Sequence, residues 1–254
     1  MSTVGSSNKA ITRSQRVLIR TLRLCKTYRI KTVETVALAG IDITIMAGEF
    51  LAVMGPSGSG KSTFFNMIGG LDSPSSGRVL IDEVDVGQLT AVELAFLRCR
   101  KVGYIFQTFN LIPYLTALEN VTAPLAFAGT SPDEACARGM EVLKLVGLGD
   151  RWSHRPLEMS GGQQQRVAIA RAMANRPSVL LCDEPTANLD LKTGEEILEI
   201  LKGMNRDHGV TIICATHDHR MLSLCDRLVW IRDGRVERIA LREELTIESG
   251  QMGG

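Results

Sequence analysis

The sequence predicts an α/β fold in which helices cover both faces of a mostly parallel β-sheet. Three short, almost wholly apolar segments, at residues 179–182, 210–215 and 228–231, have the composition of strands buried on both faces. Segments of helical character alternate with the strands, as they do in doubly covered parallel sheets. A hydrophobic content of 44% and a charged content of 22% are ordinary for a globular protein.

The N-terminal half is expected to alternate short strands with helices. Residues 17–24 suit a strand, and residues 41–46 alternate apolar with polar side chains, as half-buried strands do. Residues 50–54 form a short apolar strand that leads into a glycine-rich stretch. The remaining elements expected here, in order, are a helix at 62–68, a strand at 78–81, a helix at 91–100 and a strand at 102–106.

The C-terminal half begins with helices and ends with strands. A helix is expected at 117–127, and a second at 132–146, where Ser131 is a suitable N-cap and Pro132 suits the first turn. A helix at 161–175 should end before Pro177, because the residue preceding a proline disfavours helical geometry. The remaining elements expected, in order, are strands at 179–182 and 210–215 on either side of a helix at 193–207, a strand at 228–231, and a hairpin through Asp233-Gly234 into a strand at 235–239.

The composition excludes several classes of protein. Lys and Arg number 29 and Asp and Glu number 28, so the chain is near neutral, and aromatic residues are only 5%. We therefore expect no nucleic-acid partner. No run of about 18 apolar residues occurs, so no membrane-spanning segment is expected. The six cysteines show no CxxC spacing, which argues against a zinc site and a disulfide scaffold and favours reduced cysteines.

The strongest motif is GPSGSGKST at residues 55–63. It satisfies the pattern G-x-x-x-x-G-K-[ST], and it lies between an apolar strand and an expected helix. Glycines let such a loop wrap around phosphates with its N–H groups pointing inward. Lys61 is expected to neutralise the β and γ phosphates, and Ser62 to place its hydroxyl on Mg²⁺. The nucleotide-binding residues predicted from this motif are Gly55, Ser57, Gly58, Gly60, Lys61, Ser62 and Thr63.

Two carboxylates end the apolar strand at 179–182. The strand should deliver Asp183 to the phosphate site, where it can hold Mg²⁺ through water. Glu184 follows and could orient or deprotonate the attacking water. Together with the phosphate loop, this pair predicts hydrolysis of a nucleoside triphosphate.

A third motif, SGGQQQR at residues 160–166, decides the family. With the phosphate loop and the acidic pair, it resembles the signature of ATP-binding-cassette ATPases. Most members have Leu where this chain has Met159, which is a mild departure because both are apolar and similar in size. The resemblance spans residues 17–237 and implies that Ser160, Gly161 and Gly162 contact ATP.

The resemblance also implies roles for residues outside these motifs. Tyr28 lies where the family stacks an aromatic ring on adenine, although an ordinary core or surface tyrosine is the alternative. Gln107 occupies the place of the glutamine that reaches Mg²⁺ and the attacking water. His217 stands at the position of the switch histidine, and residues 188–190 match the loop that contacts the opposite subunit. The implied catalytic residues are thus Glu184, His217 and Gln107, and the implied Mg²⁺ ligands are Ser62, Gln107 and Asp183.

The family implies a phosphate-loop cassette with a mostly parallel sheet core, an antiparallel β subdomain and an inserted helical subdomain at about 108–175. We expect the cassette to span residues 17–240, with tails at 1–16 and 241–254. In such cassettes the signature of one copy closes on ATP held by the phosphate loop of another, so ATP joins a homodimer and hydrolysis releases it.

The segment at 109–121 is similar to the lipoprotein-releasing and macrolide-exporter branch of the family. This implies an ATPase subunit that works with a separate membrane permease at the cytoplasmic face of the inner membrane, for lipoprotein release or export of an amphiphile or peptide. Phe109, Leu111, Ile112 and Leu115 are expected to dock on the permease, unless they pack into the helical subdomain's own core. A cell-division cassette that signals to cell-wall hydrolases, a small-molecule kinase and a cassette of DNA repair or translation are the alternatives; the signature argues against the kinase.

Overall fold

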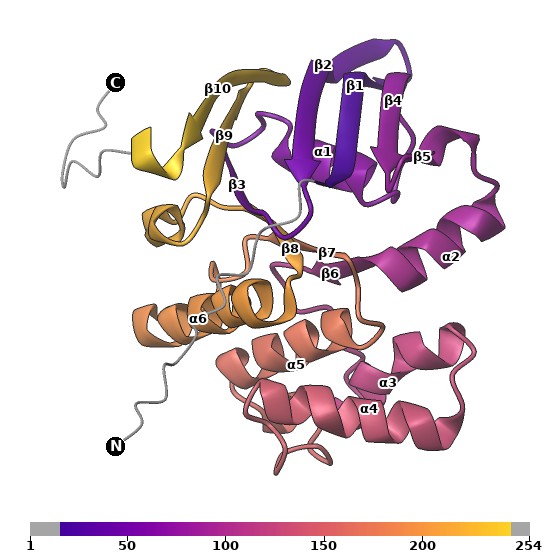
Figure 1. The fold of residues 1–254 in the computed structure, drawn as a ribbon, viewed down its shortest axis with the longest axis vertical. Coiled ribbons are helices and arrows are strands. Elements are labelled where there is room, and N and C mark those ends of the chain that lie inside the picture. Colours follow the sequence, from indigo (N-terminus) through magenta and orange to yellow (C-terminus); the bar gives the residue numbers. More distant parts are fainter. Residues whose placement is uncertain (1–15, 245–254) are drawn as a thin grey trace, which may run out of the picture.

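The computed structural model describes residues 16–244, which form two β-sheets and the helices that pack around them (Figure 1). One sheet is antiparallel with four strands, and the other has six strands, five of which run parallel. The antiparallel sheet has the order β2 (Val33–Met46), β1 (Val17–Ile30), β4 (Ser76–Ile81) and β5 (Val84–Asp85). The six-stranded sheet has the order β10 (Arg235–Leu241), β9 (Arg227–Arg232), β3 (Phe50–Met54), β8 (Thr211–Ala215), β7 (Val179–Asp183) and β6 (Val102–Ile105).

Alternation along the buried strands places side chains on both faces of the six-stranded sheet, which confirms the predicted α/β class. In β7, Val179 and Leu181 join the core that contains α1 (Lys61–Ile68) and the antiparallel sheet. Leu180 and Cys182 point the other way, into the core that contains α5 (Gly161–Met173) and α6 (Leu191–His208). Because both faces are covered, these strands are apolar throughout.

The antiparallel sheet extends further than the sequence predicted. β1 and β2 each have 14 residues and pair from Val17–Met46 to Ile30–Val33, so strand structure at residues 25–30 and 33–40 was missed. The first four residues of β2 are exposed, so burial imposes no apolar alternation there. The short β5 was also missed. The extension of β2 matters for function because it carries residues 35–37 to the phosphate loop.

The predicted helical subdomain is present as three helices that pack on one another at one end of the molecule (Figure 1). They are α3 (Ala117–Phe127), α4 (Pro132–Leu145) and α5. Ser131 caps α4 and Pro132 lies in its first turn, as expected. The outer helix α2 (Ala91–Lys101) and short 3₁₀ turns at Val86–Gln88, Pro156–Glu158, His219–Ser223 and Arg242–Glu244 complete the fold.

Both predicted tails lie mostly outside the described residues. Arg16, assigned to the first tail, contacts the carboxylate of Asp82. At the other end, β10 continues to Leu241 and the turn Arg242–Glu244 follows it. Within residues 16–244, no helix is both long and apolar enough to cross a membrane.

Candidate functional site

The predicted site is built at the carboxyl ends of four parallel strands. The phosphate loop follows β3, Gln107 follows β6, Asp183 ends β7, and His217 follows β8. Because these strands lie side by side and run in one direction, their carboxyl ends meet at one edge of the sheet, where α/β proteins bind ligands. Residues up to 162 positions apart in the chain are therefore brought together, from Gly55 to His217.

The phosphate loop has a shape that depends on glycine. Gly55 has φ 152°, and a Cβ there would lie 2.0 Å from the carbonyl oxygen of Ile231. Gly60 has φ 106°, caps α1, and has no room for a side chain beside the carbonyl of Ala37. Lys61 donates to the loop carbonyls of Gly55 (2.8 Å) and Pro56 (2.9 Å). The loop thus places an ammonium group and the start of a helix where a phosphate would bind.

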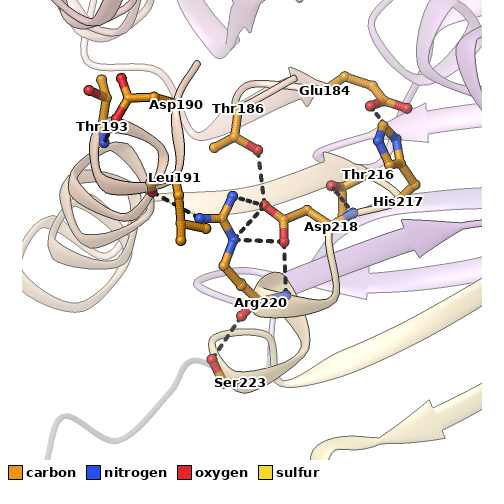
Figure 2. Close-up of polar contacts among 10 residues, drawn as sticks. All are labelled: Glu184, Thr186, Asp190, Leu191, Thr193, Thr216, His217, Asp218, Arg220 and Ser223. Atoms are coloured by element: carbon orange, nitrogen blue, oxygen red, sulfur yellow. Dashed lines mark hydrogen bonds and ion pairs between the residues drawn. The ribbon is translucent and has the colours of Figure 1, made fainter. Parts of the chain in front are cut away.

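Glu184 is held in an unusual backbone conformation beside His217. Its φ is 50°, in the left-handed region that non-glycine residues seldom adopt, and its N–H donates to the carbonyl of Ala215 at 2.9 Å. The carboxylate Oε2 lies 2.6 Å from Nδ1 of His217 (Figure 2). The Glu184 side chain is 19% exposed whereas that of His217 is 74% exposed. Backbone strain at a carboxylate in contact with a histidine is typical of functional sites.

Asp183 lies next to the phosphate loop, where Lys61 and Ser62 compensate its charge only in part. Burial and the charge of Glu184 raise its pKa above the ordinary value, against the opposing influence of Lys61 and a hydrogen bond from Ser62. Hydroxyl, carboxylate and amide oxygens from Ser62, Asp183 and Gln107 are the hard ligands that Mg²⁺ accepts, together with phosphates and water. The site therefore fits the predicted metal, with the nucleotide supplying the remaining ligands. No cluster of three His, Cys, Asp or Glu side chains suitable for a metal occurs in the described part of the chain.

These groups surround a cleft of about 550 Å³. Four residues that sequence reasoning did not select also line it: Pro56 in the phosphate loop, and Thr35, Val36 and Ala37 on the extended part of β2. No local pattern marks the β2 residues, since they reach the cleft only through the fold of the antiparallel sheet. The predicted site residues that line the cleft are Gly55, Ser57, Gly58, Gly60, Lys61, Ser62, Thr63, Gln107, Asp183, Glu184 and His217.

Tyr28 does not belong to the lining of the cleft. Its hydroxyl donates to Asp72 at 3.1 Å, and the ammonium of Lys26 lies 5.0 Å from the ring centroid. Tyr28 is 36% exposed, and its cross-strand partner Thr35 does line the cleft. The stacking of Tyr28 on adenine therefore remains a prediction about a neighbour of the cleft.

The signature residues lie on a different part of the molecule from the phosphate loop. Ser160 caps α5: its hydroxyl accepts from the N–H of Gln163, whose side chain accepts from the N–H of Ser160. Gly162 is buried, and a Cβ there would lie 2.3 Å from the side chain of Thr193. Ser160, Gly161 and Gly162 are not among the residues lining the cleft. One described chain thus presents the two halves of the predicted ATP site at separate places.

The segment 188–190 connects the cleft to α6. Asn188 donates to the backbone carbonyl of Gln107 at 2.9 Å, and Asp190 caps α6 by accepting from the N–H of Thr193 at 3.1 Å. An ion pair between Asp218 and Arg220, which sequence reasoning missed, lies beside it (Figure 2). Its only sequence signal was proximity to His217.

The residues predicted to dock on a permease differ in how far their side chains are buried. Leu111 is partly buried and packs against the core that includes the helical subdomain, which favours the alternative expected for it, and its docking on a permease stays a prediction. Ile112 is 49% exposed, and Asn120 holds its backbone through bonds to the N–H (2.8 Å) and carbonyl (3.1 Å). The carbonyl of Phe109 accepts from Arg171 at 2.8 Å, while Leu115 is half-buried.

A separate apolar groove of about 620 Å³ lies between α2, α3 and the end of β6. Val92, Phe96 and Phe127 line it and are 79%, 61% and 89% exposed. Exposed apolar side chains gathered in one groove indicate a surface for a partner. None of the predicted docking residues lines this groove.

Comparisons with known proteins agree with this arrangement. The profile of the family described as ABC transporter matches residues 38–187. An uncharacterized ABC transporter ATP-binding protein of Thermotoga maritima is 49% identical over 217 residues, 85% of this chain and 92% of that relative. Macrolide export ATP-binding/permease protein MacB of Brucella melitensis is 48% identical over 219 residues, 86% of this chain but 34% of MacB.

Solved structures are also similar. The ATP-binding cassette MJ0796, in a dimeric post-hydrolysis state bound to ADP and Pi, has a TM-score of 0.82 at 44% identity, and the match covers 89% of this chain and 99% of that one. A relative named MJ0796, from Methanocaldococcus jannaschii, is 47% identical over 225 residues, which are 87% of this chain and 96% of the relative.

Proposed function

Because this chain belongs to the ABC transporter family and is an ATPase of that family, we propose that two copies close on ATP and drive a membrane permease. The observation that carries the proposal is the separation of the phosphate loop from the signature at Ser160. Within one chain, each is only half of the predicted ATP site, because the signature residues do not line the cleft of the phosphate loop. A second copy would supply the missing half, and the dimeric state of the similar cassette MJ0796 supports this assembly.

The residues that line the cleft divide the chemical tasks of ATP hydrolysis among them. Lys61 and the N–H groups of the phosphate loop bind the β and γ phosphates. Ser62, Asp183 and Gln107 hold Mg²⁺, which when bound neutralises charge on those phosphates. Glu184 accepts the proton of the water that attacks the γ-phosphate, and its 2.6 Å contact with Nδ1 of His217 keeps the carboxylate aimed into the cleft.

The partner proposed for the groove between α2 and α3 is the permease. Phe127 is 89% exposed there, and burial of such a side chain stabilises a complex by the hydrophobic effect. The printed name of MacB joins ATP-binding and permease functions, which supports a permease as the partner. Through it, the chain would lie at the cytoplasmic face of the membrane and serve lipoprotein release or export of an amphiphile or peptide.

Co-purification from detergent-solubilised membranes tests the proposal. The wild-type chain should recover a permease, and one with four membrane segments and a large extracytoplasmic domain would support the proposed branch. Phe127→Ser should lose the permease, while Ile239→Ser, which changes an exposed side chain on β10, should retain it. Equal recovery by both variants, or no membrane protein with the wild type, would contradict the proposal.

A further inference from the structure

Arg220 joins two segments of the chain near the cleft, the loop after β8 and the start of α6. It follows His217 by three residues, in the 3₁₀ turn His219–Ser223. Its Nε lies 2.9 and 3.0 Å from the two carboxylate oxygens of Asp218, and Nη2 lies 2.6 Å from Oδ2 (Figure 2). Nη1 donates to the backbone carbonyl of Leu191, the first residue of α6, at 3.0 Å. One guanidinium group thus connects the loop after β8 to the start of α6.

Asp218 extends this connection to the segment that follows Glu184. Its carboxylate accepts from the hydroxyl of Thr186 at 3.3 Å, and its own N–H donates to the hydroxyl of Thr216 at 2.9 Å. Burial by itself would raise the pKa of Asp218, but the hydrogen bonds from Arg220 outweigh it and the pKa lies below its ordinary value. The carboxylate is therefore charged at neutral pH and makes strong, directional bonds to Arg220.

The packing around Arg220 leaves room for this arrangement. Gly194 lies on α6, and a Cβ at its position would be 3.1 Å from Nη2 of Arg220. The guanidinium borders a cavity of about 370 Å³ whose walls also include Glu184 and His217. Arg220 does not line the nucleotide cleft, so direct contact with ATP is not its role.

His217 needs external support to stay in place. Its side chain is 74% exposed, so packing does not fix it, and its position depends on its backbone loop and on the contact with Glu184. The loop is fixed by Asp218, one residue further on, and Asp218 is fixed by Arg220. Loss of the guanidinium would leave Asp218 with only its bonds to Thr186, Thr216 and the turn backbone, and so would loosen the loop without removing any group from the cleft.

We propose that Arg220 is a positioning residue, which sets the contact between His217 and Glu184 and couples it to the start of α6. The inference rests on the proposed function, since residues 188–190 directly precede Leu191 and are expected to meet the second copy. Contact between residues 188–190 and the second copy would then change the position of His217, because Arg220 bonds both Leu191 and Asp218. Arg220 would govern turnover of the closed dimer while leaving nucleotide binding alone.

Steady-state kinetics of the full chain test this with Arg220→Ala, Arg220→Lys and the control Arg206→Ala. Arg206 lies on α6 and pairs with the adjacent Asp207, away from the loop. We expect Arg220→Ala to lower kcat by roughly 10- to 100-fold, the range that small misplacement of catalytic groups costs, with KM for ATP within about twofold. The kcat of Arg220→Lys should lie between those of the wild type and Arg220→Ala, because one ammonium group cannot bond Asp218 and Leu191 at the same time, as a guanidinium does.

Single-turnover hydrolysis in a His217→Ala background separates positioning from a merely structural role. If Arg220 acts through His217, adding Arg220→Ala should not lower the hydrolysis rate of His217→Ala any further. If the two residues act independently, the rate losses of the two single variants should multiply in the double variant. A multiplied loss, a raised KM, or the same kcat as Arg206→Ala would each overturn the inference.

Hydrogen exchange gives a readout that does not depend on ATPase activity. Amides at residues 216–220 should lose protection in Arg220→Ala and keep it in Arg206→Ala; unchanged protection would overturn the inference. Absence of hydrolysis by both the wild type and Arg206→Ala would instead count against the proposed function, and exchange alone would then decide the role of Arg220.

Discussion

Glu184 is the single side chain on which hydrolysis is expected to depend most. Glu184→Gln keeps the shape of the side chain but cannot accept a proton, so turnover should fall by about 10²–10⁴-fold. Nucleotide affinity should stay the same because the phosphates are bound by the loop at 55–63. Phosphate release and equilibrium ATP binding, measured on the same preparation, check both parts; retention of more than about a tenth of wild-type turnover would refute the role of Glu184.

Lys61 should act in binding as well as in turnover. Its ammonium contacts the carbonyls of Gly55 and Pro56 within the phosphate loop and is placed to meet phosphate charge in the ground state. Lys61→Ala should therefore weaken ATP binding together with kcat/KM. Calorimetric titration with ATP at moderate salt measures this, and an unchanged Kd would speak against the assignment.

Local spacing in the sequence was enough to select residues that the fold brings to one cleft, and their roles stay predictions. The phosphate loop and the pair Asp183–Glu184 could be found because strand, loop and acid follow one another in the chain. Arg220 could not be found in this way, since its bond to Leu191 spans 29 residues. The proposed role of Arg220 depends on a contact between the turn His219–Ser223 and the start of α6, which no local pattern in the sequence marks.

At the scale of elements, the stretch between β6 and α3 combines a packed and an exposed side chain. Leu111 packs on the core whereas Ile112 is 49% exposed. Leu111→Ser should lower the free energy of unfolding by about 1–3 kcal/mol, and Ile112→Ser by less than about 0.5 kcal/mol. Urea denaturation of the two variants compares them directly; equal losses would contradict the packing seen here.

Element prediction was strongest for the buried strands and weakest at the edge of the antiparallel sheet. β3, β7 and β8 are almost wholly buried, so each is marked by an apolar run. The first four residues of β2 are exposed and have no such pattern, although their backbone pairs with β1. Burial, rather than pairing, determined which strands could be recognised.

At the scale of the whole molecule, a largely buried ion pair joins the two sheets. Glu49 follows β2 and bonds Arg227 of β9 at 2.7 Å, and Arg227 also donates to the carbonyl of Thr44 in β2 at 2.6 Å. Arg227→Met leaves a buried carboxylate unpaired and should cost about 3–5 kcal/mol of stability.

Arg232→Met provides the matched control for this pair. Arg232 also lies on β9, but both it and its partner Glu237 are exposed, and such pairs are worth about 1 kcal/mol or less. Thermal unfolding of both variants compares their losses of stability. Similar losses for Arg227→Met and Arg232→Met would show that the pair of Glu49 and Arg227 does not join the sheets.

The central claim, that ATP joins two copies of this chain, is tested most directly by the molar mass of Glu184→Gln in solution. Multi-angle light scattering with ATP and Mg²⁺ should give twice the mass of one chain, because the bound ATP is not consumed. The same protein with ADP should give the mass of a single chain, since the γ-phosphate contacts to the signature are missing. A single-chain mass in saturating ATP, or the same doubled mass with ADP, would contradict the account.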